Sequence, residues 1–478
     1  MRLLQTSRNG PWSRCLAVVA TLVLPAGVAS TALAHGPIAL CPDNPHYFVF
    51  RGRPAVLITS GEHYGAVLNS DFDYVPYLDE IARHGLNLTR TFSGVYCEAA
   101  GSFGIRGNPL APRPERLICP WARSSQPGYA GGGNKFDLRK WDEAYFRRLK
   151  DFVDQAGRRG VVVELVLFCP FYRDEMWGLS PMNAENNVNG IGRAVRTDVY
   201  TLKHADLPAL HEAVTRKIVA ELKDFDNLYY EVCNEPYFGG VTDPWQDRII
   251  AAIVDAEKDF PQKHLIAQNI ANGRQKIENP NPAVSVFNFH YATPPDTVAM
   301  NFGLNRVIGD DETGFKGSGD FIYRAEGWDF MIAGGGVYDN LDYSFTPEHE
   351  AGTATPNAPG GGGQNLRRQL AILKRFVEGF DFVKMQPDDS VIRTKLPPSA
   401  TARALVERGK QYAVYLRGDG VKSLTLALPP GRYRAEWIDT KTGAVEEGET
   451  FEQEGETKSL EVPAYREDIA LRIRGTES

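Results

Sequence analysis

Apolar strand-like segments alternate with amphipathic segments along most of the chain, and this alternation restricts the fold more than any other feature. Several of the strand-like segments are apolar throughout, which is typical of parallel strands covered by helices on both faces. Eight such repeats predict an α/β fold whose sheet closes into a (β/α)8 barrel, the TIM barrel. The segments are AVLITSGEH, LNLTRTF, VVVELVLFC, LYYEVCNE, HLIAQNI, VSVFNFHYA, RVIGDDETG and GGGVYDNLDYSF.

The segments between these strands carry helical periodicity. Over residues 73–85 apolar side chains recur at every third or fourth position, with Asp73 as a candidate N-cap. Residues 136–160 show the same spacing, beginning with Leu138 and Trp141. Further helices are expected near 207–224, near 245–258, from about residue 320, and over 365–380.

The composition changes near residue 385. The segments QYAVYLRG, SLTLALP, RYRAEWID and DIALRIR are separated by turn signals such as GDG, PPG and KTG. They predict a small antiparallel β-sandwich over 385–478, after a barrel domain over 35–384. Trp437 alternates like a core residue of this sandwich. Since the connection FVKMQPDDS is short, we expect the sandwich to pack against the barrel through apolar residues.

The first 34 residues have the pattern of a secretory signal peptide. Arg2, Arg8 and Arg14 precede an apolar stretch that leads into an A-x-A site at Ala32 and Ala34. We expect cleavage after Ala34 and a secreted or periplasmic protein. The apolar stretch is too short for a membrane span.

Five cysteines follow the predicted signal peptide, an odd number that leaves at least one free thiol. If any pair forms a disulfide, Cys97 and Cys119 are the candidates, because they flank a long loop. Cys169 and Cys233 end apolar strands and are expected to be buried thiols.

The charge pattern and the metal motifs exclude several classes of partner. The formal net charge is −7, and no basic block lies beyond the N-terminus, so no nucleic-acid partner is expected. No H-E-x-x-H or paired C-x-x-C motif is present, so neither a catalytic metal nor a cofactor is expected. We expect a monomer or a weak homo-oligomer.

Polar side chains follow the predicted barrel strands, at the rim where barrel enzymes carry their chemistry. Glu235 and Glu312 lie on nearly opposite strands and can converge on one bond. A glycosidase needs such a pair, because one carboxyl group protonates the leaving oxygen while the other attacks the sugar carbon or activates water. The strand-end residues are Glu62, His63, Arg90, Asn234, Glu235, Asn269, His290, Tyr291, Asp310, Asp311 and Glu312.

The motifs YYEVCNEP, FNFHYA and GDDETG resemble those of clan A glycoside hydrolases of the family 5 cellulase and mannanase type. The resemblance implies that Glu235 is the acid/base, that Asn234 binds the sugar 2-hydroxyl group, that Glu312 is the nucleophile and that Arg90 steadies Glu312. The C-terminal sandwich resembles the module labelled collagen-binding in apiosidase-like relatives.

The chain departs from the family pattern at two places. Tyr291 follows His290 directly, where the family usually has one residue between them, so either side chain can face the pocket. The strand 8 tryptophan that commonly floors the sugar site is not evident. Tyr338, or Trp177 from the strand 3 loop, is expected in its place. His63 is either a sugar contact or a hydrogen-bonded rim residue.

Each assignment has an alternative. Glu235 could cap the next helix, Arg90 could be a structural ion-pair partner, and side-chain alternation beside Asp310 and Asp311 decides whether Glu312 points inward. A carbohydrate-binding or adhesion protein on a barrel scaffold would be favoured if Glu235 or Glu312 were ion-paired away from the cleft. A Ser-His-Asp hydrolase lacks its G-x-S-x-G turn.

The expected mechanism is double displacement, with an ionised Glu312 held by Arg90 and a protonated Glu235 about 5 to 5.5 Å away. The product then retains its anomeric configuration. The insertions at 98–135 and 172–202, which include Tyr172, could wall off one end of a groove. An exo-acting enzyme on a plant or algal side chain therefore fits as well as a cellulase.

Overall fold

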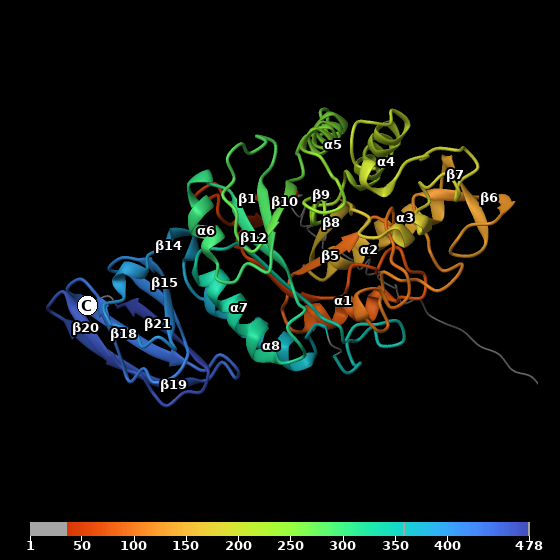
Figure 1. Cartoon of the computed structure of the whole chain (residues 1–478). Coiled ribbons are helices and arrows are strands. Elements are labelled where there is room, and N and C mark those ends of the chain that lie inside the picture. Colours follow the sequence, from red (N-terminus) through yellow and green to blue (C-terminus); the bar gives the residue numbers. More distant parts are fainter. Residues whose placement is uncertain (1–35, 357–358, 477–478) are drawn as a thin grey trace, which may run out of the picture. The chain divides into compact units, whose positions relative to one another are not determined.

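The computed structural model describes residues 36–356 and 359–476, and its largest sheet has eight parallel strands (Figure 1). In sheet order they neighbour one another as β4, β13, β12, β11, β10, β9, β8 and β5. Asn87 joins the two end strands: its backbone N–H donates to Ile58 O at 3.3 Å, and its side-chain oxygen accepts from Ile58 N at 3.0 Å. The predicted (β/α)8 barrel is confirmed. Its strands are β4 Leu57–Gly61, β5 Leu88–Phe92, β8 Val162–Phe168, β9 Leu228–Cys233, β10 Ile266–Asn272, β11 Val286–His290, β12 Val307–Thr313 and β13 Val337–Leu341.

Helices follow most of these strands, as the periodicity predicts. One connection differs: between β10 and β11 the described chain has no helix. Pro280 and Pro282 stand in this connection and are unfavourable inside a helix. The helices are α1 Tyr74–Arg83, α2 Glu143–Arg158, α3 Asp174–Leu179, α4 Asp206–Leu222, α5 Asp243–Ala256, α6 Asp296–Asn301, α7 Asp320–Ile332 and α8 Gln364–Glu378.

The helix predicted over 136–160 begins later than expected. Leu138 and Trp141 belong to a strand, β7 Asn134–Trp141, which pairs with β6 Trp121–Pro127. Asp142 then caps α2, because its side chain accepts from the backbone N–H groups of Ala144 and Tyr145. Periodicity alone could not separate the half-buried strand from the helix that it leads into.

A small sheet closes the end of the barrel where its strands begin. Its strands are β1 Ala39–Leu40, β2 Phe48–Phe50 and β3 Arg53–Ala55. Ile38 and Phe48 pack there against Leu57, Leu88 and Val162, which lie at the starts of barrel strands. The opposite rim, where the strands end, is therefore the one left for a site.

The C-terminal region is antiparallel, as predicted. A six-stranded sheet packs with a two-stranded one around an apolar core that includes Trp437. The six strands are β14 Gln386–Pro387, β15 Thr401–Glu407, β16 Gln411–Arg417, β21 Asp468–Gly475, β18 Gly431–Ile438 and β19 Val445–Gln453, and the pair is β17 Ser423–Ala427 with β20 Thr457–Glu461.

The C-terminal sheet packs on helix α7 of the barrel. The Trp328 ring lies against the Tyr415 ring with centroids 5.4 Å apart, and both belong to one continuous apolar core. The apolar packing expected from the short connection is confirmed. A buried ion pair adds to it, with Arg324 Nη2 at 2.7 Å from Asp468 Oδ1.

All five cysteines of the described chain are buried free thiols. The pairing suggested for Cys97 and Cys119 is therefore corrected, because each thiol lies in apolar surroundings without a disulfide. Burial raises the pKa of both thiols to about 12. No helix among the described residues is long and apolar enough to cross a membrane, and the predicted signal peptide lies outside those residues.

Candidate active site

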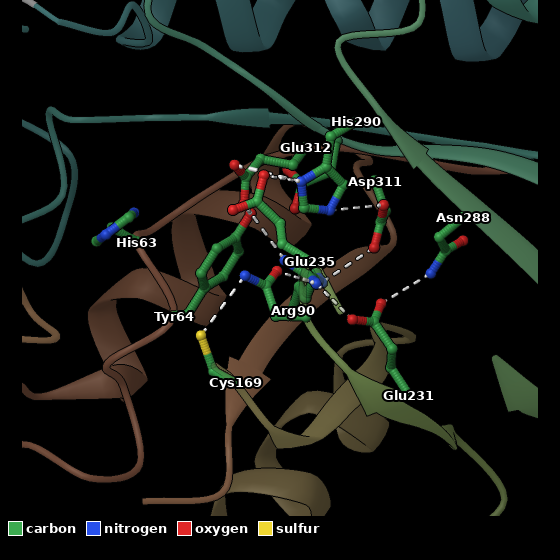
Figure 2. Close-up of polar contacts among 12 residues, drawn as sticks. His63, Tyr64, Arg90, Cys169, Glu231, Glu235, Asn288, His290, Asp311 and Glu312 are labelled. Carbon is green, nitrogen blue, oxygen red and sulfur yellow. Dashed lines mark hydrogen bonds and ion pairs between the residues drawn. The ribbon is translucent and has the colours of Figure 1, made fainter. Parts of the chain in front are cut away.

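Glu235 and Glu312 face each other at the open rim of the barrel (Figure 2). Glu235 follows β9 by two residues, and Glu312 lies near the end of β12. A carboxylate oxygen of one lies within 4.8 Å of a carboxylate oxygen of the other. Both side chains line a cavity of about 370 Å³. This proximity fits a retaining pair, since the carboxyl groups of inverting pairs stand about 6.5–9.5 Å apart to leave room for a water.

Glu312 is held as a carboxylate by four neighbours. Tyr64 donates a hydrogen bond to Oε2 at 2.8 Å, and the Tyr291 hydroxyl donates to Oε1. Arg90 Nη1 lies 3.5 Å from Oε2, and His290 Nδ1 lies 3.5 Å from Oε1. Burial opposes ionisation, but His290, Arg90 and the Tyr291 hydrogen bond outweigh it and hold the pKa of Glu312 well below its usual value.

His290 lies between three carboxylates. Its Nδ1 is 3.3 Å from Glu235 Oε1, and its Nε2 is 3.4 Å from Asp311 Oδ1. Burial would lower the pKa of His290, but the charges of Glu312 and Asp311 raise it well above the usual value. The imidazolium is therefore the favoured form, and it neutralises part of the acidic site.

Glu235 takes hydrogen bonds from two tyrosines. Tyr172 donates to Oε2 at 2.5 Å, and Tyr237 donates to Oε1 at 3.3 Å. The Tyr172 hydroxyl also accepts from the Asn234 side chain at 2.8 Å. Glu235 thus faces the cavity and does not cap a helix, which removes that alternative.

Arg90 connects the rim to a buried acidic layer in the barrel interior. Its Nη2 donates to Glu231 Oε1 at 2.6 Å and to Asn234 Oδ1 at 2.7 Å, while its Nε lies 3.0 Å from Asp311 Oδ2. Arg90 therefore has a structural role as well as contact with Glu312.

Glu164 belongs to the same buried layer, because Asn288 donates hydrogen bonds to both Glu164 and Glu231. Burial raises the pKa values of Glu164 and Asp311, whereas Arg90 outweighs burial at Glu231 and lowers its pKa. The protonated form is therefore favoured at Glu164 and Asp311, and the charged form at Glu231. The sequence analysis listed Asp311 but missed Glu164 and Glu231, because these two interrupt apolar strands without any other signal.

Several non-glycine residues at the rim have left-handed backbone conformations, among them three that lie at the catalytic pair. Their φ values are 56° at Tyr64, 36° at Glu235 and 53° at Tyr291. Such conformations cost about 1–3 kcal/mol each and are typical of functional sites. At Tyr291 the turn brings the ring back to Glu312, so both His290 and Tyr291 contact the nucleophile candidate, although they are adjacent in sequence.

The strand β12 directs three successive acids to different places. Asp310 accepts from the backbone of Ala292, Asp311 faces the buried layer, and Glu312 faces the cavity. The pairing with β11 shifts register here: Phe289 stands opposite Asp310, but His290 stands opposite Glu312. Asp311 faces the barrel interior, so simple alternation would point Glu312 to the opposite face of the strand. The register shift instead turns Glu312 toward the cavity.

The structure brings His63, Arg90, Asn234, His290 and Tyr291 to the two glutamates, either in the cavity lining or in contact with them.

Two predicted substrate contacts are corrected. Trp177 is buried, donates to Ala194 O and packs on Phe171, outside the cavity lining. Tyr338 is also buried and donates to Tyr323 O behind the strand. Position near a strand end did not reveal which way either ring points.

The cavity has further lining residues that strand-end reasoning did not select. Tyr172 lies in an insertion that the sequence marks as a wall, but most of the others carry no pattern of their own. They are Tyr64, Phe92, Glu98, Phe103, Leu110, Cys169, Tyr172, Asn272, Gly314, Phe315 and Lys316.

A (β/α)8 barrel with two close carboxylates over one rim cavity defines a protein of the retaining glycosidase class. Residues 116–316, which include both glutamates, match the family described as Cellulase (glycosyl hydrolase family 5). This part of the barrel is similar to that family, and the protein is a glycosidase of the retaining class.

Solved structures share the fold at low sequence identity. A candidate glycoside hydrolase from Bacteroides vulgatus matches with a TM-score of 0.67 and 16% identity, over 94% of this chain and 84% of that one. A glycoside hydrolase family 5 protein from the same organism matches with a TM-score of 0.60 and 14% identity, over 92% and 94%. No curated protein sequence matches this chain.

Proposed function

We propose that the protein hydrolyses O-glycosidic bonds of an oligosaccharide or polysaccharide by double displacement, with Glu312 as nucleophile and Glu235 as acid/base. The observation that carries the proposal is the difference between the two carboxyl groups. His290 and two tyrosine hydroxyls contact each glutamate, but Arg90 ion-pairs with Glu312 and makes no ion pair with Glu235. The pKa of Glu312 is accordingly held well below its usual value, by His290 and Arg90 against the effect of burial.

In the first step Glu312 attacks the anomeric carbon, and a covalent glycosyl ester forms as the glycosidic C–O bond breaks. Glu235 gives its proton to the departing oxygen. In the second step the ionised Glu235 takes a proton from water, and the water oxygen displaces Glu312 from the anomeric carbon. Two inversions leave the configuration retained.

Asn234 is positioned for the sugar 2-hydroxyl contact that the resemblance implies. Its side-chain oxygen accepts from Arg90 and its nitrogen donates to Tyr172, so the amide orientation is fixed before substrate binds. Such a group, oriented in advance, can strengthen a hydrogen bond as the transition state forms.

The cavity supports action at a chain end. Its volume of about 370 Å³ is near the lower end for ligand sites, and Glu98, Phe103 and Leu110 of the first insertion form one wall. A terminal sugar, such as a side chain of the kind that apiosidase-like relatives would remove, suits this shape better than a long glucan.

The non-catalytic alternative is not favoured. It required that Glu235 or Glu312 be ion-paired away from the cleft, and both side chains line the cavity.

The nucleophile is tested with Glu312→Ala and a screen of aryl glycosides. Turnover should fall on the order of 10⁴-fold or more for every substrate that the parent enzyme cleaves. Added azide should restore product of inverted configuration, because it attacks directly from the side left open. Full activity in Glu312→Ala would reject the assignment, and Asp311 would be tested next.

The acid/base is tested with Glu235→Ala. Aryl glycosides with good leaving groups need little protonation, so their first step should persist while hydrolysis of the ester slows, and a burst should appear. Azide should now give product of retained configuration. The opposite stereochemistry in the two variants would show that the roles are exchanged.

We also propose export, with cleavage after Ala34. The support is the arginine-flanked apolar stretch and its A-x-A site. Sequencing the N-terminus of the protein recovered from outside the cytoplasm should give His35 first. Recovery of the unprocessed chain inside the cell would reject the proposal.

A further inference from the structure

A second polar pair lies in the cavity apart from the catalytic glutamates. Glu98 and His63 both line the cavity, with His63 Nε2 at 3.5 Å from Glu98 Oε1. His63 follows β4, and Glu98 lies in the insertion after β5. Figure 2 shows His63 beside Tyr64 and apart from the Arg90 network.

The Glu98 carboxylate is oriented by the protein. Asn108 donates to its Oε2 at 2.5 Å, and Tyr96 donates to its Oε1 at 3.3 Å. The Asn108 side-chain oxygen in turn accepts from Leu110 N at 2.9 Å. A carboxylate has about four acceptor positions, so Glu98 keeps capacity for further hydrogen-bond donors.

His63 is left without hydrogen bonds. The residue is 7% exposed, and neither ring nitrogen has a hydrogen-bond partner. Buried polar atoms without partners are unfavourable, so a ligand that supplies partners to the His63 ring removes that cost. Rotation of the ring about Cβ–Cγ exchanges its carbon and nitrogen edges and can present a nitrogen to the cavity.

The charge of the lining selects against anions. Among the described residues that line the cavity, the acids are Glu98, Glu235 and Glu312, and the bases are His63 and Lys316. Burial lowers the pKa of His63, but Glu98 outweighs burial and raises it, so this base is already balanced by Glu98. The Lys316 ammonium is already bound by Glu326. A sugar carboxylate near Glu98 would meet a like charge, whereas a hydroxyl group can donate to Glu98 and accept from His63.

The catalytic pair indicates which part of the substrate meets Glu98. The leaving group lies next to Glu235, which protonates it, so the sugar ring that reacts with Glu312 extends away from Glu235. Tyr64 donates to Glu312, and its ring stacks on the His63 ring with centroids 5.3 Å apart, which places the His63–Glu98 pair on the side of the reacting sugar. Phe92, Phe103 and Leu110 add apolar surface for its C–H groups.

We propose that Glu98 and His63 bind adjacent hydroxyl groups of the reacting sugar, so that the enzyme accepts neutral glycosides and discriminates against uronides. This inference rests on the proposed glycosidase function. Glu98 is then a specificity-determining residue that takes no part in the bond changes.

The test compares matched pairs of 4-nitrophenyl glycosides, such as glucoside with glucuronide and galactoside with galacturonide. For the pair with measurable turnover, kcat/KM should favour the neutral sugar by about tenfold or more. Glu98→Gln keeps the shape and removes the charge, and should narrow the ratio by about tenfold. The control Glu278→Gln changes an exposed carboxylate outside the cavity and should leave the ratio unchanged.

The outcomes separate the two proposals. If glycosides are cleaved but the uronide is preferred, or if Glu98→Gln leaves the ratio unchanged, the recognition role is wrong and the glycosidase function stands. If no glycoside is cleaved, calorimetric titration with the neutral monosaccharides and their uronates decides: equal or tighter binding of the uronate overturns the inference. A thermal unfolding curve that matches the parent's shows that the variant is folded. His63→Gln provides a second variant, which should bind the neutral sugar more weakly than the parent enzyme does.

Discussion

At the scale of single residues, the site separates two chemically identical carboxyl groups by their neighbours. Glu312 gains a cation on each side, Arg90 and His290, and two tyrosine hydroxyls, while Glu235 receives tyrosine hydrogen bonds and a single contact from His290. Pairs whose surroundings push their protonation apart are typical of acid and base roles. The difference can be tested through pH.

Replacing His290 by Gln removes the cation beside Glu312. Because the pKa of Glu312 is held low, its charge contributes stability and nucleophilicity above its unfolded pKa, and both are lost as the pH falls through its folded pKa. The variant should raise that pKa, so the acid limb of kcat/KM should move to higher pH by about one unit or more. Tyr291→Phe removes a neutral donor and should shift the limb less. An unmoved acid limb in His290→Gln would mean that His290 does not set the charge of Glu312.

The sequence could predict those site residues whose polarity contrasts with the apolar strands that they end. Glu235 and Glu312 stand out because they end apolar strands, and the same reasoning found Arg90. It could not find Glu164, because this residue lies inside the strand β8 and its carboxyl group is held by Asn288 from a strand distant in sequence. It also placed Tyr338 wrongly, since ring direction depends on packing.

At the scale of elements, most predicted helix starts agree with the structure, and one does not. Asp73 caps α1 as expected, accepting from Val75 N. The beginning of α2 was wrong, because the apolar spacing of Leu138 and Trp141 continues into the helix although these residues form a strand of a hairpin. Helix and strand periods can coincide over a few residues, and only the cap at Asp142 marks the change.

The cap can be tested by stability. Asp142→Ala leaves the N–H groups of Ala144 and Tyr145 without their acceptor, and should lower the free energy of unfolding by about 1 kcal/mol. Asp142→Asn keeps an acceptor oxygen and should cost much less. Urea unfolding followed by tryptophan fluorescence measures both, and activity should stay unchanged. Equal losses in the two variants would attribute the effect to charge instead of capping.

At the scale of the whole molecule, the barrel and the C-terminal sheets share one apolar core. Tyr415, Leu405 and Ala470 of the sheets belong to the same buried cluster as Trp328 of α7. The ion pair of Arg324 with Asp468 is buried in this interface, where Asp468 also accepts from Tyr415. The sequence indicated the contact through its short connection, but the ion pair joins residues 144 positions apart and has no local signal.

Breaking the ion pair should be costly. Arg324→Met leaves Asp468 buried without its cation, and should lower the free energy of unfolding by about 3–5 kcal/mol. The double variant Arg324→Met, Asp468→Leu removes both charges and should recover part of the loss. Arg393→Met, at an exposed position of the same region, is the control. A loss under 1 kcal/mol in Arg324→Met would show that the interface does not depend on the pair.

The connection between barrel and sandwich should resist proteases for the same reason. Met385 is fully buried, and Asp388 N and Arg393 N donate to Ala404 O and Thr425 O, so the segment 383–393 cannot extend into a protease site without opening the interface. Limited trypsin digestion should leave Lys384 and Arg393 uncut while the protein is folded. Met385→Ser removes the buried anchor and should make cleavage after Lys384 at least several-fold faster, because local opening costs less. Rapid cleavage of the parent chain there, into two stable fragments, would show instead that the sandwich is a separate module on a flexible tether.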